Sequence, residues 1–442
     1  MITRAVIVVG LAFAAQVARA DPMTAKDLAR KNTESYVTGL PLFAYSTDIG
    51  FGGGARAYYY WNGHRDDDRF ATTPYLHRVF LQVFGSTNGV QFHWLDYDAP
   101  RIAGSRFRIR AQLVFGRNTN SNYFGRGNAA MRPLAFPNST QAFDSYADYV
   151  ATQQRITGGT AYTKYDQFDL LKPLGIVTVE RMLGPHLRVL SGLGFSYTRI
   201  ADYTGKQVDA VDETGAQTTA TMAATRLRED CDAGRIVGCE GGREHAVRLA
   251  VSYDTRDFEP DPNRGVFWEL TVDAATAALG SEYDYLRVFT AARGYWSPIP
   301  ARADLVLAGR GLLEMQTDGT PFFSQDALPF TEDFRIGLGG HRTLRGYRQD
   351  RFVGPTMALL NGEVRWTFTR FTVARQKLAL IAVPFVDAGR AFDGVRSLTA
   401  RDWRVGYGAA LRVSWNLATI GTIDYGRSSE DTGLYVNFGH MF

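Results

Sequence analysis

The segment GLGGHRTLRGYRQDRF, residues 337–352, has the residue types of an anion-binding site. Three glycines open it, and arginines then recur at every third position, at Arg342, Arg345, Arg348 and Arg351. Glycines let a backbone turn its N–H groups toward a phosphate, and guanidinium groups bind phosphate oxygens in pairs. The segment could cradle phosphate, contact nucleic acid, or serve a larger protein shell, and the surrounding chain decides between these roles.

Other groups that could do chemistry carry weaker signals. Residues 50–57, GFGGGARA, have the glycines of a nucleotide-binding turn, but RAYYYW continues as a strand where that fingerprint needs a helix. We expect these glycines to make the first strand weak and flexible, with a simple packing role as the alternative. His93 lies near Asp96 and Asp98, but no G-x-S-x-G motif accompanies them, so we interpret them as a solvated or lumen-facing cluster. The seven histidines lack metal-ligand spacing. We therefore predict no enzyme, no metal and no cofactor.

The N-terminus predicts export. Residues 1–20 have a charged start, a short apolar run and Ala18-Arg19-Ala20 before Asp21, which is typical of a cleaved secretory signal. Residues 21–42 are expected to form a short periplasmic lead-in. The formal net charge of the whole chain is only +4, so an exported protein with this charge is not expected to bind nucleic acid.

Two cysteines, Cys231 and Cys239, lie in a long polar stretch. In an exported protein this pair predicts a local disulfide that staples a loop. A metal site is the alternative, and the absence of a nearby histidine pair weakens it.

Period-two alternation dominates residues 43–442 and predicts strands. In one example Val266, Trp268, Leu270 and Val272 alternate with Phe267, Glu269, Thr271 and Asp273. The polar partners are often charged, which favours a wet lumen on one face and lipid on the other. No stretch has eighteen consecutive apolar residues. We predict an all-β fold, a transmembrane antiparallel β-barrel of sixteen strands, with the fifth near residues 145–155. Fourteen strands and a soluble β-sandwich are the alternatives.

Connection lengths predict which end of each strand faces which side of the membrane. Short connections at 86–89, 184–186, 297–303 and 416–419 are interpreted as periplasmic turns. Long polar connections at 62–70, 199–245, 317–356 and 394–404 are interpreted as outer loops. The arginine-rich segment then belongs to the sixth outer loop, which we expect to fold inward.

The C-terminal stretch GLYVNFGHMF predicts a strand with an assembly signal. Leu434, Val436, Phe438, His440 and Phe442 share one face of an extended chain, and Phe442 is an aromatic end residue. This pattern resembles the β-signal of outer-membrane proteins, which assembly machinery captures by pairing with the strand edge.

Three motifs together resemble the BamA/TamA superfamily of outer-membrane assembly and two-partner secretion barrels. TLRGY at 343–347 is similar to the V-R-G-F/Y motif of its sixth outer loop. FVDAG at 385–389 is similar to its F-x-D-x-G motif on the thirteenth strand. YDTRDFEPDPNRGVFWEL at 253–270 is similar to its strand–turn–strand signature. The chain departs from the pattern because the lead-in is too short for a POTRA domain, which indicates a POTRA-less barrel of the bacterial surface antigen type.

The resemblance implies a set of site residues. Arg345, Gly346 and Tyr347 would form a loop-lock motif, with Gly346 turning the tip and Tyr347 against the wall. The resemblance places Phe385, Asp387 and Gly389 on the lumenal face. Arg345 could then pair with Asp387 and with Glu363 on the twelfth strand. For Arg342, Arg348 and Arg351 we favour a lumen-lining role over further anchoring.

The resemblance also implies a function. We expect a multi-pass protein of the bacterial outer membrane that assists insertion or translocation of proteins, or lipid transfer, through a loop-gated barrel or a lateral seam. The alternative is a passive pore or structural surface barrel. Expected partners are outer-membrane lipid and lipopolysaccharide, the assembly machinery for its own insertion, and either a second copy of the chain or a separate periplasmic protein.

Overall fold

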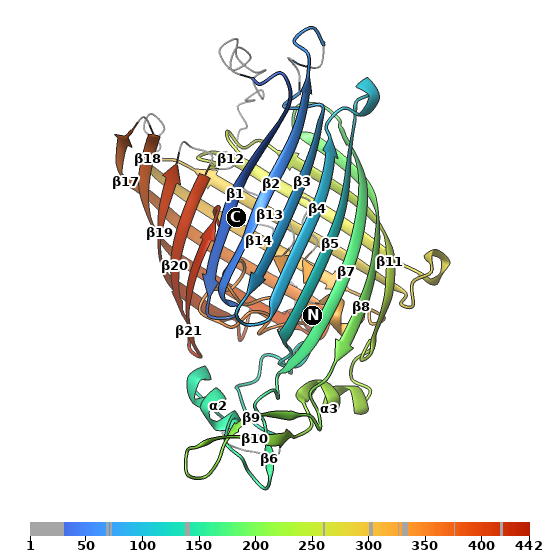
Figure 1. Ribbon diagram of the computed structural model, residues 1–442, viewed down its shortest axis with the longest axis vertical. Helices are drawn as coiled ribbons and strands as arrows, with labels where there is room; N and C mark the ends of the chain where they lie inside the picture. Colours follow the sequence, from blue (N-terminus) through green and yellow to red (C-terminus); the bar gives the residue numbers. More distant parts are fainter. Residues whose placement is uncertain are drawn as a thin grey trace, which may run out of the picture.

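Sixteen strands form a closed antiparallel barrel in the computed structural model (Figure 1). The structure describes residues 31–67, 70, 73–137, 142–259, 261–299, 304–325, 327–328, 335–374, 376–415 and 419–442. The barrel strands, in order around the wall, are β1 (Glu34–Ser46), β2 (Gly50–Gly63), β3 (His77–Ser86), β4 (Val90–Ala99), β5 (Phe107–Asn122), β7 (Gln167–Met182), β8 (Leu187–Ala201), β11 (Gly241–Asp254), β12 (Gly265–Ala275), β13 (Tyr285–Trp296), β14 (Leu305–Gln316), β17 (Thr356–Val373), β18 (Gln376–Phe392), β19 (Arg404–Trp415), β20 (Thr419–Arg427) and β21 (Thr432–Phe438). The predicted fold class and strand count are confirmed.

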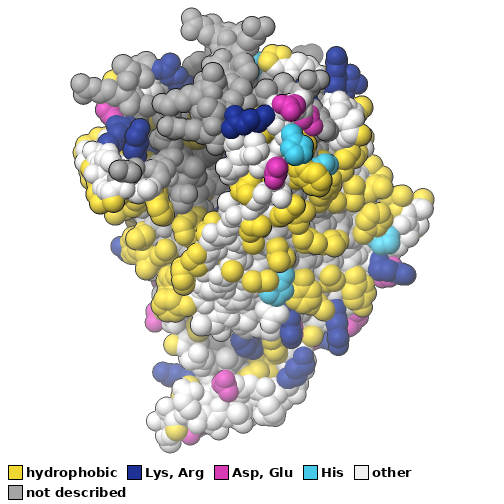
Figure 2. All heavy atoms as spheres, turned by 45° about the horizontal axis from the view of Figure 1, so that its top comes forward, with side chains coloured by type: hydrophobic (Ala, Val, Ile, Leu, Met, Phe, Trp, Pro, Cys, Tyr) yellow, Lys and Arg dark blue, Asp and Glu magenta, His cyan; other side chains and the backbone are white. Residues whose placement is uncertain are grey.

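The alternation in sequence becomes an outer and an inner face. On β12 the side chains of Phe267 and Glu269 point inward and are fully buried. On the neighbouring strand β13, Leu286 and Trp296 point outward and are 43% and 54% exposed. Hydrophobic side chains accordingly cover much of the outer wall (Figure 2). Among the described residues, none of the helices is long and apolar enough to span a membrane.

Two strand assignments were wrong, and their errors cancel in the count. The barrel begins at Glu34 rather than at residue 43, and the run at 50–57 belongs to β2, not to the first strand. Gly39 and Pro41 hide the alternation of β1, and Pro41 is tolerated because this part of β1 pairs with a strand on one side only. The expected fifth strand is instead helix α2 (Tyr146–Gln153), which Ser145 caps by accepting a hydrogen bond from the Asp148 N–H.

Because β1 was not predicted, the first connections were also assigned to the wrong ends of the barrel. Successive antiparallel strands run in opposite directions, so one missed strand moves each following connection to the other end of the barrel. The connection between β2 and β3, predicted as an outer loop, lies at the end opposite the long connections. The turn at 86–89, predicted as periplasmic, lies at the end of the long connections. We call these two ends the turn end and the loop end.

The loop end carries a small domain of its own. The connections β5–β7 and β8–β11 form a three-stranded sheet of β6 (Thr160–Ala161), β10 (Gln217–Met222) and β9 (Gln207–Val211), together with α2 and α3 (Arg226–Asp232). They project beyond the lower end of the barrel in Figure 1. The predicted disulfide between Cys231 and Cys239 is present and packs against a buried apolar cluster that includes Phe322 and Phe323 of α4 (Phe322–Gln325). Short elements complete the chain: η1 (Ile102–Gly104), η2 (Ala277–Leu279), β15 (Ala327–Leu328), β16 (Arg335–Ile336) and η3 (Val395–Ser397).

Removing this disulfide should loosen the loop domain and leave the barrel intact. The bond closes a loop with a sequence separation of 8, and closing such a short loop contributes about 2–3 kcal/mol of local stability. We expect Cys231→Ser with Cys239→Ser to raise the rate of proteolysis between β8 and β11. The midpoint of barrel unfolding should not move. If the barrel instead lost as much unfolding free energy as the loop domain, the two would unfold together.

The predicted signal peptide at 1–20 and the first part of the lead-in lie outside the described residues.

Candidate functional site

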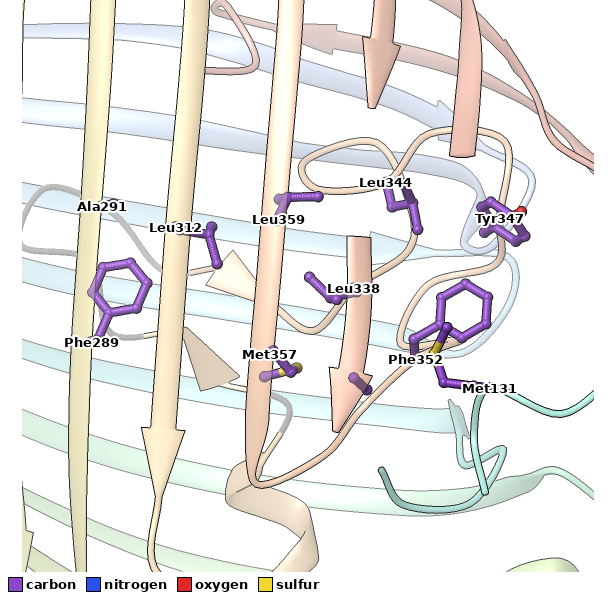
Figure 3. Close-up of a cluster of buried hydrophobic side chains, with 11 residues drawn as sticks. Met131, Phe289, Ala291, Leu312, Leu338, Leu344, Tyr347, Phe352, Met357 and Leu359 are labelled. Carbon is purple, nitrogen blue, oxygen red and sulfur yellow. The ribbon is translucent and has the colours of Figure 1, made fainter. Parts of the chain in front are cut away.

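Residues 337–352 lie inside the barrel, between its eleventh and twelfth strands in sequence. Side chains of this segment pack on the inward face of the wall (Figure 3). Those from the segment are Leu338, Leu344, Tyr347 and Phe352, and those from the wall include Phe289, Leu312, Met357 and Leu359, all of them buried. The lumen is therefore packed by protein at this level, whereas the sequence predicted a wet interior.

Glycine and threonine fix the path of the segment. Gly346 has a φ of 90°, and a Cβ there would lie 2.6 Å from the backbone carbon of Arg427, so only glycine fits. Thr343 ties off the preceding turn, because its hydroxyl accepts from the Gly339 N–H at 2.9 Å and donates to the Gly337 carbonyl at 2.8 Å. These contacts present Arg345 to the wall.

Arg345 binds Asp387 through a two-pronged ion pair. Its Nε and Nη2 donate to the two carboxylate oxygens at 2.8 and 3.0 Å, and its backbone N–H donates to Oδ2 at 3.1 Å. Both side chains are completely buried. Burial alone would lower the pKa of Arg345, but the carboxylates of Asp387 and Glu363 outweigh it and shift the pKa upward. The arginine is therefore charged at any physiological pH.

The remaining predicted lumenal residues surround this pair. The Arg345 guanidinium lies 3.3 Å from the centre of the Phe385 ring, which is a cation–π contact. A Cβ on Gly389 would lie within 3.3 Å of Leu338, so glycine there allows the segment to approach the wall. Asn361, which the sequence interpretation did not single out, donates to Asp387 at 2.7 Å and to the Thr343 carbonyl at 2.8 Å.

Glu363 joins three arginines into one network. It accepts from Arg345 Nη1 at 3.1 Å, from Arg365 Nε at 3.0 Å and from both Nη atoms of Arg412 at 2.6 and 3.0 Å. Arg365 and Arg412 occupy polar positions in the alternating sequences of their strands and were not among the predicted site residues. Their inward direction was readable from that alternation, but their shared partner was not, because β17 and β19 are not neighbours in the wall.

The network has the properties of an anchor rather than of a reaction centre. Its two carboxylates each accept several hydrogen bonds from guanidinium groups, an arrangement that fixes the segment to the wall and offers neither a free base nor a nucleophile. In the described part of the chain no cluster of histidine, cysteine and carboxylate side chains could hold a metal ion. His93 stacks on Phe115, whereas Asp96 is buried and binds Arg78 at 2.6 Å. Because they occupy positions of opposite parity on β4, they do not form a catalytic grouping.

The lumen-lining role favoured for the other arginines was wrong for two of them. Arg348 and Arg351 bind acidic residues of the turn between β20 and β21, Asp431 and Glu430. Arg342 contacts His341 within the segment. The spacing of the arginines does not indicate these partners, since they lie about eighty residues away in a turn with no distinctive sequence.

The predicted assembly-signal residues do not share one face in the structure. β21 ends at Phe438, whose side chain points outward and is 45% exposed. Gly439 then adopts a φ of 86°, and the following residues turn into the lumen.

Residues 440 and 442 bind inside the lumen. His440 accepts from Arg412 at 2.6 Å and donates to Asp261 at 2.7 Å. The ring of Phe442 is buried beside Tyr295, Val306 and Ala308 and contacts Arg310 and Arg365. The expected shared face was wrong because a left-handed glycine interrupts the alternation, while the role of these residues as an assembly signal stays a prediction.

Docking of residues 440–442 should weaken in acid. Burial, with Arg365 and Arg412 nearby, lowers the pKa of His440 from 6.5 to about 3. An undocked histidine takes a proton below about 6.5, whereas the docked one does not, so each pH unit below that value costs docking about 1.4 kcal/mol. A cysteine at Met441, which is buried, should therefore become labelled by a thiol reagent as the pH falls from 6.5 toward 3.

The labelling should be measured as a ratio to a cysteine at exposed Thr214, which corrects for the reagent's own pH dependence. His440→Gln cannot take up the proton, so its ratio should stay flat over this range. An equal pH dependence in that variant would assign the effect to another group.

Comparisons with known proteins agree with this geometry. The Omp85 superfamily domain matches residues 122–440, and a domain of unknown function (DUF5982) matches residues 14–76. BamA from Haemophilus ducreyi lacking POTRA domains 1–3 is 11% identical, with 92% of this chain and 70% of that chain covered and a TM-score of 0.54. CdiB from Escherichia coli is 9% identical, with 91% of this chain and 62% of that chain covered and a TM-score of 0.50. No curated protein matches the sequence.

At these identities the solved structures support the fold, while the superfamily match spans most of the chain and confirms the resemblance found in the sequence. The chain therefore belongs to the Omp85 superfamily, and its sixteen-stranded barrel implies a bacterial outer-membrane protein.

Proposed function

We propose that the protein assists the insertion or translocation of proteins at the outer membrane, and that the contact between β1 and β21 is the lateral seam through which it does so. The single observation that carries this proposal is the small extent of that contact. β1 and β21 share two residue pairs, Tyr45 with Val436 and Ser46 with Tyr435. The next contact around the wall, between β1 and β2, has thirteen pairs.

The weak seam leaves a strand edge available. Residues 34–44 of β1 pair with β2 but, among the described residues, with no part of β21. Unpaired N–H and C=O groups on such an edge can accept an added strand. An edge facing the membrane would let an unfolded barrel protein form its first strand pairs without crossing the lumen.

In this proposal the Arg345 network is the lock that keeps residues 337–352 inside the lumen. Ordering a long segment costs conformational entropy, which the buried ion pairs and the apolar cluster offset. A separate periplasmic protein or a second copy of the chain would deliver the client protein. Transfer of lipid, rather than protein, through the same seam is the alternative.

A reconstituted insertion assay tests the seam. An unfolded barrel protein is added to vesicles with and without this protein, and its folding is followed by gel shift. Vesicles containing the protein should accelerate folding. Cysteines at Tyr45 and Val436, which face each other across the seam, should abolish the acceleration when oxidised and restore it when reduced. Either single cysteine is the matched control.

A passive pore or structural surface barrel is the competing function. It predicts that the oxidised seam variant behaves like the same variant after reduction. It also predicts that depletion in cells alters solute uptake alone. Insertion activity predicts that depletion changes the levels of other outer-membrane proteins. Crosslinking in cells would identify the trapped client or partner.

A further inference from the structure

The segment that follows Arg345 lies across the loop end of the seam. Two short turns meet there, residues 47–49 between β1 and β2 and residues 428–431 between β20 and β21. The first belongs to one side of the seam and the second to the other. Residues 346–351 contact both turns, which none of the arginine positions indicated in the sequence.

Of the contacts that this segment makes with the two sides of the seam, most are with the β21 side. The Ser428 hydroxyl donates to the Gly346 carbonyl at 2.7 Å, and the Gly346 N–H donates to the Tyr435 hydroxyl at 3.2 Å. Arg351 donates to both carboxylate oxygens of Glu430 at 2.8 and 2.9 Å. The segment is therefore held firmly to the turn beside β21.

Arg348 extends the contact to the β1 side. Its Nη1 donates to the Thr47 carbonyl at 2.6 Å and lies 3.9 Å from Asp48. Its Nε lies 2.7 Å from the Asp431 carboxylate, on the opposite side of the seam. The neighbouring Gln349 N–H donates to Asp48 at 3.1 Å. One guanidinium group thus bridges two turns whose adjoining strands, β1 and β21, share two residue pairs.

The surroundings hold this guanidinium in place. It lies 4.4 Å from the centre of the Tyr146 ring of α2, and the Tyr146 N–H donates to the Glu430 carbonyl at 2.8 Å. The Arg348, Asp48 and Asp431 side chains are 21%, 7% and 15% exposed. Partly buried charges of opposite sign attract each other more strongly than exposed pairs do.

We propose that residues 346–351 form a clamp that holds the β1–β21 seam closed at its loop end, and that Arg348 is the residue that spans the seam. This inference rests on the proposed function and adds its regulation. Arg345 anchors the segment to β17 and β18, and Arg348, three residues further along the chain, joins the turns beside the two edge strands. Displacement of the segment from the lumen then releases the seam.

Distance measurements between spin labels test the clamp in the full chain in nanodiscs. The labels are attached to cysteines at Phe43 of β1 and Leu434 of β21, both exposed on the outer wall. The wild type should give one narrow distance. Arg348→Gln should add a longer distance and raise the open-to-closed ratio on the order of tenfold, the change expected for the loss of one charge-assisted contact of about 1.4 kcal/mol.

Arg342→Gln is the matched control, since Arg342 contacts His341 inside the segment and should leave the distance narrow. If Arg348→Gln does not fold, Asp48→Asn with Asp431→Asn removes the carboxylates that Arg348 approaches on both turns and should widen the distance in the same way. An unchanged distribution in a folded variant of either kind overturns the clamp.

The insertion assay separates this proposal from the function on which it rests. If the variant opens the seam but no form of the protein accelerates insertion, the clamp stands and the proposed function fails. If the protein accelerates insertion and the Arg348→Gln distance stays narrow, the function stands and the clamp fails.

Discussion

Replacing Arg345 with alanine is expected to lower the free energy of unfolding of the barrel by about 3–5 kcal/mol, because it leaves buried carboxylates without their partner. Asp387 loses two side-chain hydrogen bonds, and Glu363 loses one. Both side chains are fully buried, so water does not replace the guanidinium unless the segment moves. Denaturant unfolding in detergent, followed by gel shift, measures the loss.

Two further variants locate the cause. Arg345→Lys keeps the charge but cannot bind Asp387 with two parallel bonds, so we expect an intermediate loss. Arg345→Ala combined with Asp387→Asn removes the uncompensated charge and should recover part of the stability. A loss in the double variant as large as the sum of the two single losses would mean that the residues act independently.

The same variant should open the lumen if the segment acts as a lock. Planar-bilayer recordings of Arg345→Ala should then show larger or more frequent conductance events than the wild type. Identical recordings from an equally well folded variant would remove the lock from the proposal and leave the seam as its basis.

Replacing Glu363 with glutamine is expected to destabilise the barrel by at least as much, about 3–5 kcal/mol, because three buried arginines share this one carboxylate. Arg345 and Arg412 are fully buried, and Arg365 is 3% exposed. Like charges that Glu363 now separates would then repel each other. Unfolding midpoints in detergent measure the loss, and it should change little with salt concentration, since salt screens buried charges much less than exposed ones.

A double-mutant cycle with Arg412 checks the mechanism. Arg412→Gln alone should cost less than Glu363→Gln, since Glu363 keeps two other arginines. The double variant should be more stable than additivity predicts, because it removes both members of the closest pair, at 2.6 Å. Additive losses would show that Glu363 acts through packing rather than charge.

The barrel itself could be predicted from the sequence, since every membrane strand must alternate between lipid and interior. Its boundaries could not. Pro41 and Gly39 break the pattern of β1, and α2 at 146–153 presents apolar residues at intervals that a strand could also have. Pattern alone does not separate a short helix from a strand of the same length.

The candidate site, too, could be predicted from the sequence only in part. The resemblance to a known family placed Arg345, Asp387 and Glu363, and in the structure these residues lie together. Arg348 was interpreted as lumen-lining because its partners are single acidic residues in short turns, and no period marks them. His440 and Phe442 do not continue the outer face of β21 because the chain turns at Gly439, and an alternating pattern gives no sign of such a turn.

The contact between Arg348 and Thr47 has a consequence for the order of folding events. The two residues are 301 positions apart in sequence, and contacts of such separation form late because the chain between them must first be ordered. The segment can bridge the two turns only after the first and last strands have come together. Docking of the segment is therefore expected late in folding, and a half-inserted chain would lack it.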